Sequence, residues 1–298
     1  MNDFLTRIQF DILDEINRSS LTKAEEIAEK TKHSIEAVDG CLQELCDLGY
    51  AGKNGITEKG ISALEPYRVK RVVFIAAGFG SRMVPITLNT PKPLVRVHGV
   101  RMIDTMLDAV LAAGIREIYI VRGYLGEQFD QLLYKYPMIQ FIDNPLYNDA
   151  NNISSAMLAS HLLCNSYVCE ADLVLANPAL FRSHHYRSNF LGIYMEHTDD
   201  WCFDVKSGMI CGQIPTGGDR CYQEVGISYW NEEDGKKLDK HLKAAFEMPD
   251  GKNRYWDQVP LRIFADKYQV ELRECQVGDI VEIDSFNELK AIDESYDV

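Results

Sequence analysis

The chain has 298 residues, of which 46% are hydrophobic and 26% charged, so it can form one large α/β domain and a smaller second one. Its formal net charge of −14 disfavours general affinity for nucleic acid, because phosphate backbones bind to lysine and arginine side chains. We recognise no cleavable signal sequence and no apolar run near the roughly 18 residues of a membrane span, so we expect no membrane association.

Eight cysteines are scattered along the chain, and none belongs to a C-x-x-C pair. Structural zinc sites commonly contain such pairs, so this spacing argues against a zinc ion. Unpaired cysteines in a chain without an export signal are typical of a reducing compartment, and we therefore expect a cytoplasmic location.

The first predicted domain spans residues 1–68 and is mainly helical. Hydrophobic spacing predicts helices over Phe4–Ile16, Thr22–Thr31 and Ser34–Leu48. The glycine-rich stretch Gly49–Gly60 then predicts a short β-hairpin. This order of elements resembles a winged helix-turn-helix domain, with the third helix in the position of the recognition helix.

The charge pattern of this domain argues against DNA binding. Residues 1–68 contain 8 Lys and Arg against 13 Asp and Glu. The third predicted helix has no Lys or Arg and carries the acidic residues Glu36, Asp39, Glu44 and Asp47. Carboxylates in a major groove would repel the phosphates, and a helix without arginine cannot make the usual arginine–guanine contacts. We therefore expect a module for interaction or homodimerisation rather than a DNA reader.

The second predicted domain, residues 69–298, opens with the most informative segment of the chain. An apolar run, Val72–Ile75, predicts a buried strand, and a glycine-rich turn follows it directly. Backbone N–H groups can approach a phosphate closely in such a turn, because glycine has no Cβ. Neither a P-loop nor a dinucleotide-binding spacing is present. The residues expected to contact a nucleotide here are Ala76, Ala77, Gly78, Gly80, Ser81 and Arg82.

Two cations belong to the same segment. Arg82 supplies a planar guanidinium, and Lys92 a point charge on a stiff stretch between Pro91 and Pro93. Residues 100–114 then show the apolar spacing of a helix and end in glycine. The turn and the two cations together are suited to holding a nucleoside triphosphate.

Strand and helix patterns alternate up to residue 175, which predicts a mainly parallel sheet covered on both faces. Ligands of such sheets bind at the carboxyl ends of the strands. The later pattern is less regular, and we interpret this half as the side that binds a second substrate, the acceptor of a group from the nucleotide. The predicted strands are Glu117–Arg122, Met138–Ile142, Tyr167–Ala171, Leu191–Glu196, Met209–Ile214 and Glu224–Tyr229, and the predicted helices are Leu125–Tyr136, Asn152–Leu163 and Phe286–Ser295.

Two strands end on pairs of acidic residues. Glu170 and Asp172 close one of them, and Glu282 and Asp284 follow the same pattern near the carboxyl terminus. The two-residue period of a strand places each pair on one face. Mg²⁺ needs only one or two protein carboxylates when phosphate oxygens complete its shell. The sequence therefore predicts a magnesium site at this edge, although Asp284-Ser285 could instead cap the last helix.

Aromatic residues gather in the carboxyl-terminal half, with carboxylates beside them. Rings with nearby acids suit a quaternary ammonium group, which cannot donate N–H hydrogen bonds. A primary ammonium would need a carboxylate ligand more than a cage of aromatic rings. A sugar phosphate would need hydrogen-bonding side chains around its hydroxyls. The residues predicted to bind the acceptor are Trp201, Tyr229, Trp230, Tyr255, Trp256 and Asp257.

Over residues 69–298 the chain resembles the nucleotidyltransferases that make activated sugars and activated choline, and bacterial CTP:phosphocholine cytidylyltransferases most closely. It departs from the common sugar-enzyme pattern at Phe79 and Met83, where leucine is usual. The resemblance implies a Rossmann-like, mainly parallel or mixed sheet. It also implies transfer of CMP from CTP to phosphocholine, with CDP-choline and pyrophosphate as products and Mg²⁺ as cofactor.

The resemblance also implies roles for individual residues. Lys92 and Arg82 correspond to catalytic cations, and Asp172 and Asp284 to the metal-binding aspartates. Glu170 stands where many relatives carry aspartate. The residues implied to line the nucleoside pocket are Gly123, Tyr124, Asn152, Ser154, Glu170 and Ala171. Activity on 2-aminoethylphosphonate or on a sugar 1-phosphate remains an alternative, as does a regulator that only senses a nucleotide.

Overall fold

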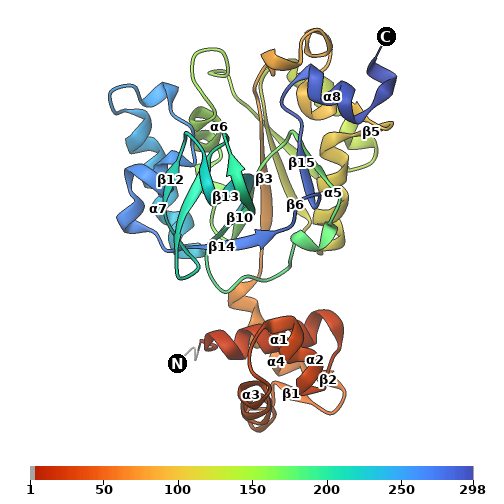
Figure 1. The fold of residues 1–298 in the computed structure, drawn as a ribbon, viewed down its shortest axis with the longest axis vertical. Helices are drawn as coiled ribbons and strands as arrows, with labels where there is room; N and C mark the ends of the chain where they lie inside the picture. Colours follow the sequence, from red (N-terminus) through yellow and green to blue (C-terminus); the bar gives the residue numbers. More distant parts are fainter. Residues whose placement is uncertain (1–3, 298) are drawn as a thin grey trace. The chain divides into compact units, whose positions relative to one another are not determined.

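The computed structural model describes residues 4–297, which divide into two compact units (Figure 1). Unit 1 comprises the chain up to Arg68 together with His184–Tyr186, and unit 2 comprises Val69–Ser183 and the chain from Arg187 onward. Each unit has a hydrophobic core of its own. Within residues 4–297, no helix has the length and apolar character needed to cross a bilayer.

Unit 1 consists of helices packed around one core, with a short antiparallel hairpin. Its elements in chain order are α1 (Arg7–Ser19), α2 (Ala24–Thr31), α3 (Ile35–Asp47), β1 (Ala51–Gly52), β2 (Gly55–Ile56) and α4 (Glu58–Leu64). Leu13, Ile27 and Leu45 are fully buried, one from each of the first three helices. The hydroxyl of Ser34 accepts a hydrogen bond from the backbone N–H of Ala37 and caps α3.

A short segment from far along the chain completes unit 1. The ring of Tyr186 stacks on that of Tyr67, with centroids 5.6 Å apart, and the backbone N–H of His185 donates to the carbonyl of Tyr67 at 2.9 Å. The sequence prediction had assigned every residue after 68 to the second domain. Three residues without a periodic pattern of their own give no signal of such a placement.

The described residues of unit 2 form a nine-stranded mixed sheet in the order β10-β14-β12-β11-β13-β8-β3-β6-β7. β3 lies between β6 and β8 and runs parallel to both, whereas β13 runs antiparallel to β8. The strands are β3 (Arg71–Ala76), β6 (Glu117–Arg122), β7 (Ile139–Asp143), β8 (Ser166–Glu170), β10 (Asn189–Thr198), β11 (Cys202–Lys206), β12 (Met209–Ile214), β13 (Gly218–Trp230) and β14 (Val270–Cys275). The predicted α/β class is confirmed, and the sheet is mixed. It is parallel around β3, as the alternating pattern predicted, and largely antiparallel in the half that contains β11, β12 and β13.

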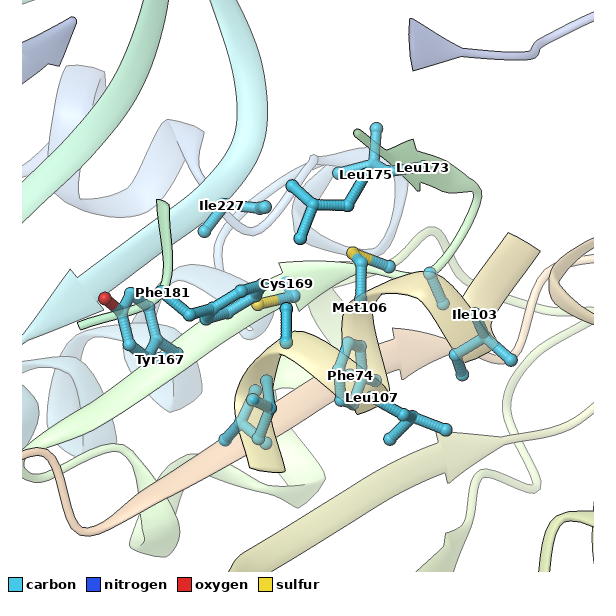
Figure 2. Packing of buried hydrophobic residues seen from close by; sticks show 14 of the residues in the cluster. Phe74, Ile103, Met106, Leu107, Tyr167, Cys169, Leu173, Leu175, Phe181 and Ile227 are labelled. Carbon is cyan, nitrogen blue, oxygen red and sulfur yellow. The ribbon is translucent and has the colours of Figure 1, made fainter. Parts of the chain in front are cut away.

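Helices cover both faces of the sheet, because the side chains of β3 alternate between two apolar cores. Phe74 packs with residues of α5 (Met102–Ala112), where Figure 2 shows Ile103, Met106 and Leu107 beside it. Val73 points to the other face, whose core includes residues of α6 (Ile153–Leu158) and α7 (Glu232–Phe246). Buried on both faces, β3 is a continuous apolar run rather than an alternating one.

Two small antiparallel pairs lie outside the large sheet: β4 (Arg96–Val97) with β5 (Val100–Arg101), and β9 (Leu173–Leu175) with β15 (Ile280–Glu282). In the second pair Glu282 lies opposite Leu173. This pairing brings the chain after β15 next to Asp172, although 110 positions separate Asp172 from Glu282 in the sequence. The last α-helix, α8 (Phe286–Ile292), begins shortly after β15.

The elements differ locally from the sequence prediction. Residues 126–134 form a 3₁₀ helix where an α-helix was predicted, and α6 ends at Leu158 rather than Leu163. Helix α4 was not predicted, since Glu58–Gly60 was included in the hairpin and the residues after it were assigned to no element. These are short segments, in which packing decides the conformation more than hydrophobic periodicity does.

Candidate active site

A cavity of about 670 Å³ opens at the carboxyl ends of β3 and β8. It is lined by the glycine-rich turn after β3, by the segment around α6, by the acidic ends of β8 and β15, and by residues of β13 and the 255–257 segment. Segments from almost the whole length of unit 2 therefore meet at the edge where α/β sheets bind their ligands.

The turn after β3 is shaped by its glycines. Gly80 adopts a left-handed conformation (φ 67°), and a Cβ there would lie 3.1 Å from Cβ of Lys92. The hydroxyl of Thr87 donates to the carbonyl of Gly80 at 3.0 Å, and the backbone N–H of Tyr124 donates to that of Ala77 at the same distance. These two hydrogen bonds fix the backbone of the turn beside the cavity. The predicted nucleotide-binding residues of this turn that line it are Ala76, Ala77, Gly78, Gly80, Ser81 and Arg82.

Lys92 lies between the two predicted metal-binding aspartates. Its Nζ is 2.6 Å from Oδ2 of Asp172 and 2.8 Å from Oδ1 of Asp284, and the residue is only 8% exposed. Burial lowers the pKa of Lys92, but the charges and hydrogen bonds of both aspartates outweigh it and hold the pKa above its ordinary value. Arg82 contacts the same carboxylate from outside, with Nη2 2.8 Å from Oδ2 of Asp284.

The helix-cap alternative for Asp284 is not what the structure contains. The N-cap of α8 is Ser285, whose side chain accepts from the backbone N–H of Glu288 in a capping box. The carboxylate of Asp284 is turned to Lys92 and Arg82 instead. It is therefore available to the cavity rather than committed to the helix.

The acidic residues of β8 and β15 have the donor set of a magnesium site. Carboxylate oxygens of Glu170, Asp172 and Glu282 lie within 4.8 Å of one another. Burial and then the charge of Asp172 raise the pKa of Glu170 well above its usual value, and the same causes raise the pKa of Glu282 to about 8. Oδ1 of Asp172 is buried without a hydrogen-bond partner. A divalent cation would offset the repulsion between the carboxylates and would give this oxygen a ligand to bind, so these residues fit the ion.

Gly226 permits the close approach of this cluster to β13. A Cβ at Gly226 would lie 2.5 Å from Oε2 of Glu170 and 2.7 Å from its Cγ. Only glycine leaves room for the Glu170 side chain beside the neighbouring strand. The sheet backbone therefore sets the position of one carboxylate of the cluster.

Amide and hydroxyl groups line the part of the cavity near α6. The Nδ2 of Asn144 donates to the hydroxyls of Ser154 and Ser155 at 3.0 and 2.9 Å. Oδ1 of Asn152 accepts from the backbone N–H of Trp256 at 2.9 Å, which leaves its amide N–H groups for a ligand. Asn144 was not predicted, although it follows the β7 strand at the same edge, so the rule that singled out Asp172 could have found it.

Two carboxyl groups without a cation partner lie at the β13 side of the cavity. Glu224 and Asp257 both line it, are hydrogen-bonded to each other, and both accept a hydrogen bond from Nε2 of Gln213. Burial and then the charge of Asp257 raise the pKa of Glu224 well above its usual value, and burial raises the pKa of Asp257. Within residues 4–297 neither forms an ion pair with Lys, Arg or His.

The predicted aromatic residues divide into two groups. Trp201 and Tyr255 line the cavity, with ring centroids 5.3 Å apart. Tyr229, Trp230 and Trp256 are at most 2% exposed and belong to the two hydrophobic cores of unit 2. The structure therefore does not bring these three rings to the cavity, because β13 and the following segments turn them into the sheet packing.

Two further predicted nucleotide-binding residues, Gly123 and Tyr124, are not among those that line the cavity. A Cβ at Gly123 would lie 2.7 Å from atoms of the Tyr147 side chain, and Tyr147 does line it. The ring of Tyr124 packs edge-on against Phe79, and its hydroxyl donates to the carbonyl of Leu88. Both residues support the turn from behind, whereas the predicted residues Asn152, Ser154, Glu170, Ala171 and Asp172 line the cavity.

The cavity carries a strong excess of acidic groups. Its only lysine and arginine among the described residues are Lys92 and Arg82, against seven carboxyl groups: Glu170, Asp172, Asp200, Glu224, Asp257, Glu282 and Asp284. A triphosphate could not enter such a site without divalent cations to offset repulsion. The acidic groups away from the turn are instead suited to a cationic ligand.

Comparison with known proteins agrees with this arrangement. The model of the nucleotidyl transferase family matches residues 71–187. The 2-aminoethylphosphonate cytidylyltransferase of Lancefieldella rimae is 36% identical over 227 residues, which cover 75% of this chain and 92% of that protein. The chain belongs to the nucleotidyltransferase family. Another relative, the choline-phosphate cytidylyltransferase of Streptococcus pneumoniae, is 31% identical over 225 residues, or 75% of this chain and 97% of that protein.

Solved structures of nucleotidyltransferases have the same fold. The CTP:phosphocholine cytidylyltransferase of Streptococcus pneumoniae superimposes with a TM-score of 0.71 at 31% identity, covering 76% of this chain and 99% of that one. A glucose-1-phosphate thymidylyltransferase from Bacillus anthracis, named as putative, superimposes with a TM-score of 0.60 at 15% identity, covering 76% of this chain and 94% of that one, and supports the fold alone. The cavity of this nucleotidyltransferase therefore lies in a fold shared with cytidylyltransferases.

Proposed function

We propose that the protein transfers a cytidylyl group from CTP to a small acceptor that has a phosphonate or phosphate at one end and a primary ammonium at the other. The acceptor that fits best is 2-aminoethylphosphonate. The products are the CMP-linked acceptor and pyrophosphate. One observation carries the choice of acceptor, the pair of buried carboxyl groups Glu224 and Asp257, which line the cavity without a cation of their own.

CTP as the donor is supported by the relatives and by the polar groups near α6. Both curated relatives described above are cytidylyltransferases. Asn152 offers its amide N–H groups at the cavity wall, and an amide can pair with the edge of a pyrimidine. Ser154 lines the same wall, where its hydroxyl donates to the carbonyl of Asn151 and accepts from Asn144. The turn around Gly78 and Gly80 has no side chains at these positions and so accommodates the phosphates, and Arg82 neutralises part of their charge.

The acceptor end is argued from hydrogen-bonding chemistry. A primary ammonium has three N–H donors and can satisfy Glu224 and Asp257 together, whereas a quaternary ammonium has none. Burial makes these carboxyl groups costly to ionise unless a cation joins them, so a ligand that supplies the cation gains that free energy. Trp201 and Tyr255 then bound the same space with two aromatic faces.

The chemistry needs charge neutralisation and positioning more than proton transfer. A phosphonate oxygen of the acceptor forms a bond to the α-phosphorus of CTP, and the bond from that phosphorus to the bridging oxygen of pyrophosphate breaks. Mg²⁺, held by Asp172 with Glu170, Glu282 or Asp284, would supply charge compensation for the phosphates. Lys92, next to both aspartates, is placed to draw the two reacting anions together and to stabilise the charge that develops between them.

Phosphocholine is the second candidate acceptor. It is favoured by the ring pair Trp201 and Tyr255, whose faces can contact a quaternary ammonium through cation–π attraction of about 0.5–2 kcal/mol each. The sequence alone favoured it on the strength of five rings, but the other three lie in the cores. Two of the predicted rings line this part of the cavity together with three carboxyl groups, the third being that of Asp200. This excess of carboxyl groups favours a primary ammonium over a quaternary one.

The deciding experiment measures pyrophosphate release from CTP and Mg²⁺ with four acceptors: 2-aminoethylphosphonate, phosphocholine, glucose 1-phosphate and ethylphosphonate. We expect the highest kcat/KM with 2-aminoethylphosphonate, about tenfold or more above phosphocholine, because only a primary ammonium satisfies both carboxyl groups. A preference for phosphocholine would retain the reaction and replace the acceptor. No release with any acceptor, together with saturable CTP binding, would favour a nucleotide-sensing regulator.

For unit 1 we propose a winged-helix-like module for interaction or homodimerisation. The order of α1 to α3, the β1–β2 hairpin and the exposed acidic residues of α3 support this proposal. Light scattering of the full chain, and of a chain truncated before Val69, tests it directly. A dimer that requires residues 1–68 supports homodimerisation, and specific binding of duplex DNA at physiological salt would contradict the proposed role.

A further inference from the structure

Gln213 lies behind the two carboxyl groups of the proposed acceptor site. It belongs to β12, is 7% exposed and is not among the residues that line the cavity. Its Nε2 donates to Oε2 of Glu224 and to Oδ2 of Asp257, while both of those residues do line the cavity. One neutral amide therefore holds two acidic groups that come from different segments of the chain.

This arrangement fixes the direction in which the two carboxyl groups face. The hydrogen bond between Glu224 and Asp257 needs a proton on one of them, and the two groups repel each other when both are ionised. An amide nitrogen carries two N–H donors and can bind one oxygen of each group. Gln213 therefore binds one oxygen of each carboxyl group, and a donor that arrives through the cavity meets two groups that are already held in place.

The amide itself is oriented by this contact. Oε1 of Gln213 is buried without a hydrogen-bond partner, so its position is explained by the two bonds that Nε2 makes. The two hydrogen bonds of Nε2 offset the free energy that the unsatisfied carbonyl oxygen costs. A neutral donor also adds no charge, unlike a lysine or arginine, so the pair keeps its capacity for a cationic ligand.

Resting on the proposed function, we propose that Gln213 is a positioning residue that determines specificity for acceptors with a primary ammonium. It acts through Glu224 and Asp257 and does not touch the acceptor. It holds both carboxyl groups at one spacing, so that a group with several N–H donors can bind them together. Acceptors without such a group gain nothing from the arrangement.

The test uses two acceptors that differ only in the amine. The full-length protein is assayed with 2-aminoethylphosphonate and with ethylphosphonate, at saturating CTP and Mg²⁺, and the ratio of the two kcat/KM values is the specificity. Gln213→Met keeps an unbranched side chain of similar length and removes the donor. We expect this variant to lose about tenfold or more of the specificity, mainly through a higher KM for 2-aminoethylphosphonate, with the KM for CTP unchanged.

A second variant keeps the proposal testable if Gln213→Met folds poorly. Gln213→Lys places a tethered ammonium beside Glu224 and Asp257, where it competes with the amine of the acceptor. We expect its KM for 2-aminoethylphosphonate to rise by at least as much, while ethylphosphonate is affected little. Gln131→Leu is the matched control, because Gln131 is exposed and its side chain hydrogen-bonds to Arg101 and to the backbone of Gln128, outside the cavity.

The outcomes separate the two proposals. If the wild type does not prefer 2-aminoethylphosphonate over ethylphosphonate, the proposed acceptor site fails, and the inference about Gln213 fails with it. If the wild type has the preference and both Gln213 variants lower activity equally for the two acceptors, Gln213 is only structural and the inference alone is overturned. A loss of preference confined to the Gln213 variants supports it.

Discussion

Oδ1 of Asn152 lies 2.9 Å from the backbone nitrogen of Trp256 and accepts its hydrogen bond. Asn152 immediately precedes α6 in the part of the cavity assigned to the nucleoside, whereas Trp256 lies between Tyr255 and Asp257 in the part assigned to the acceptor. The hydrogen bond therefore joins the two halves of the proposed site, and the position of one half depends on the other.

Asn152→Ala should disturb both substrates at once. The change leaves the buried N–H of Trp256 without a partner, at a cost of about 1–3 kcal/mol, and frees the segment that carries Asp257. We expect a rise in the KM values of both CTP and the acceptor, measured by pyrophosphate release. Asn253→Ala is the control, since the side chain of Asn253 is exposed and hydrogen-bonds to the neighbouring Asp250. A rise for CTP alone would mean that the hydrogen bond does not couple the two halves.

Lys92→Met should abolish most of the turnover. The lysine is the buried cation of the cavity, and loss of a comparable electrostatic contact to a developing anion costs about 10²–10³ in kcat. We also expect a lower melting temperature, because Asp172 and Asp284 then lack the ammonium between them. Lys243→Met, at an exposed ion pair on α7, should change neither. Near-normal turnover of the Lys92 variant would contradict its proposed catalytic role.

Asp172→Asn should weaken metal binding and activity together. Removing one ionised carboxyl group from the acidic cluster lowers its affinity for a divalent cation. We expect weaker binding of Mn²⁺, followed by water proton relaxation, and a fall in kcat of about 10² or more at saturating Mg²⁺. Asp199→Asn is the control, because that carboxylate is 98% exposed and outside the cluster. Unchanged Mn²⁺ affinity would remove Asp172 from the metal site.

Acceptor binding should strengthen as the pH rises. Burial and then the charge of Asp257 raise the pKa of Glu224, so the carboxyl group stays protonated to a higher pH than usual and cannot pair with a cation below it. The KM for 2-aminoethylphosphonate should therefore fall as the pH rises through this raised value, until the amine loses its own proton near about pH 10. Steady-state assays between these limits measure the trend.

Two controls isolate the contribution of Glu224 to that trend. Ethylphosphonate shares the phosphonate ionisation but lacks the amine, so its pH profile should not show the additional fall in KM. Glu224→Gln removes the titrating group, and the profile of 2-aminoethylphosphonate should then follow that of ethylphosphonate. Identical profiles for the two acceptors in the wild type would mean that Glu224 does not bind the amine.

The sequence predicted the parts of the structure that depend on local pattern. The apolar run of β3 and the acidic ends of β8 and β15 were visible without coordinates, because strands alternate with period two and their carboxyl ends share one edge. Lys92 was singled out by its charge between two prolines. The structure places its ammonium against Asp172 and Asp284, a contact that a spacing argument does not contain.

What the sequence could not supply depends on packing between distant segments. Trp201 and Trp256 each stand beside an aspartate in the sequence, yet one lines the cavity and the other is in the core. Neither lies in a strand, so the packing of distant segments, and not a local hydrophobic period, decides where each ring is placed. Glu224 was missed because its importance comes from Asp257 and from Gln213 on the next hairpin. From sequence alone, a charged residue in a strand such as Glu224 is ordinarily expected to be exposed to solvent.

The two tryptophans offer a direct test of that distinction. Trp256 is 2% exposed and packs against Phe190 and Trp230, so Trp256→Ala should destabilise the protein by about 3–5 kcal/mol. Trp201 lines the cavity, and Trp201→Ala should mainly raise the acceptor KM with little change in stability. Urea unfolding and steady-state kinetics on both variants measure the two effects. If Trp256→Ala keeps the stability of the wild type and loses only acceptor affinity, Trp256 is a binding residue after all, as the sequence had predicted.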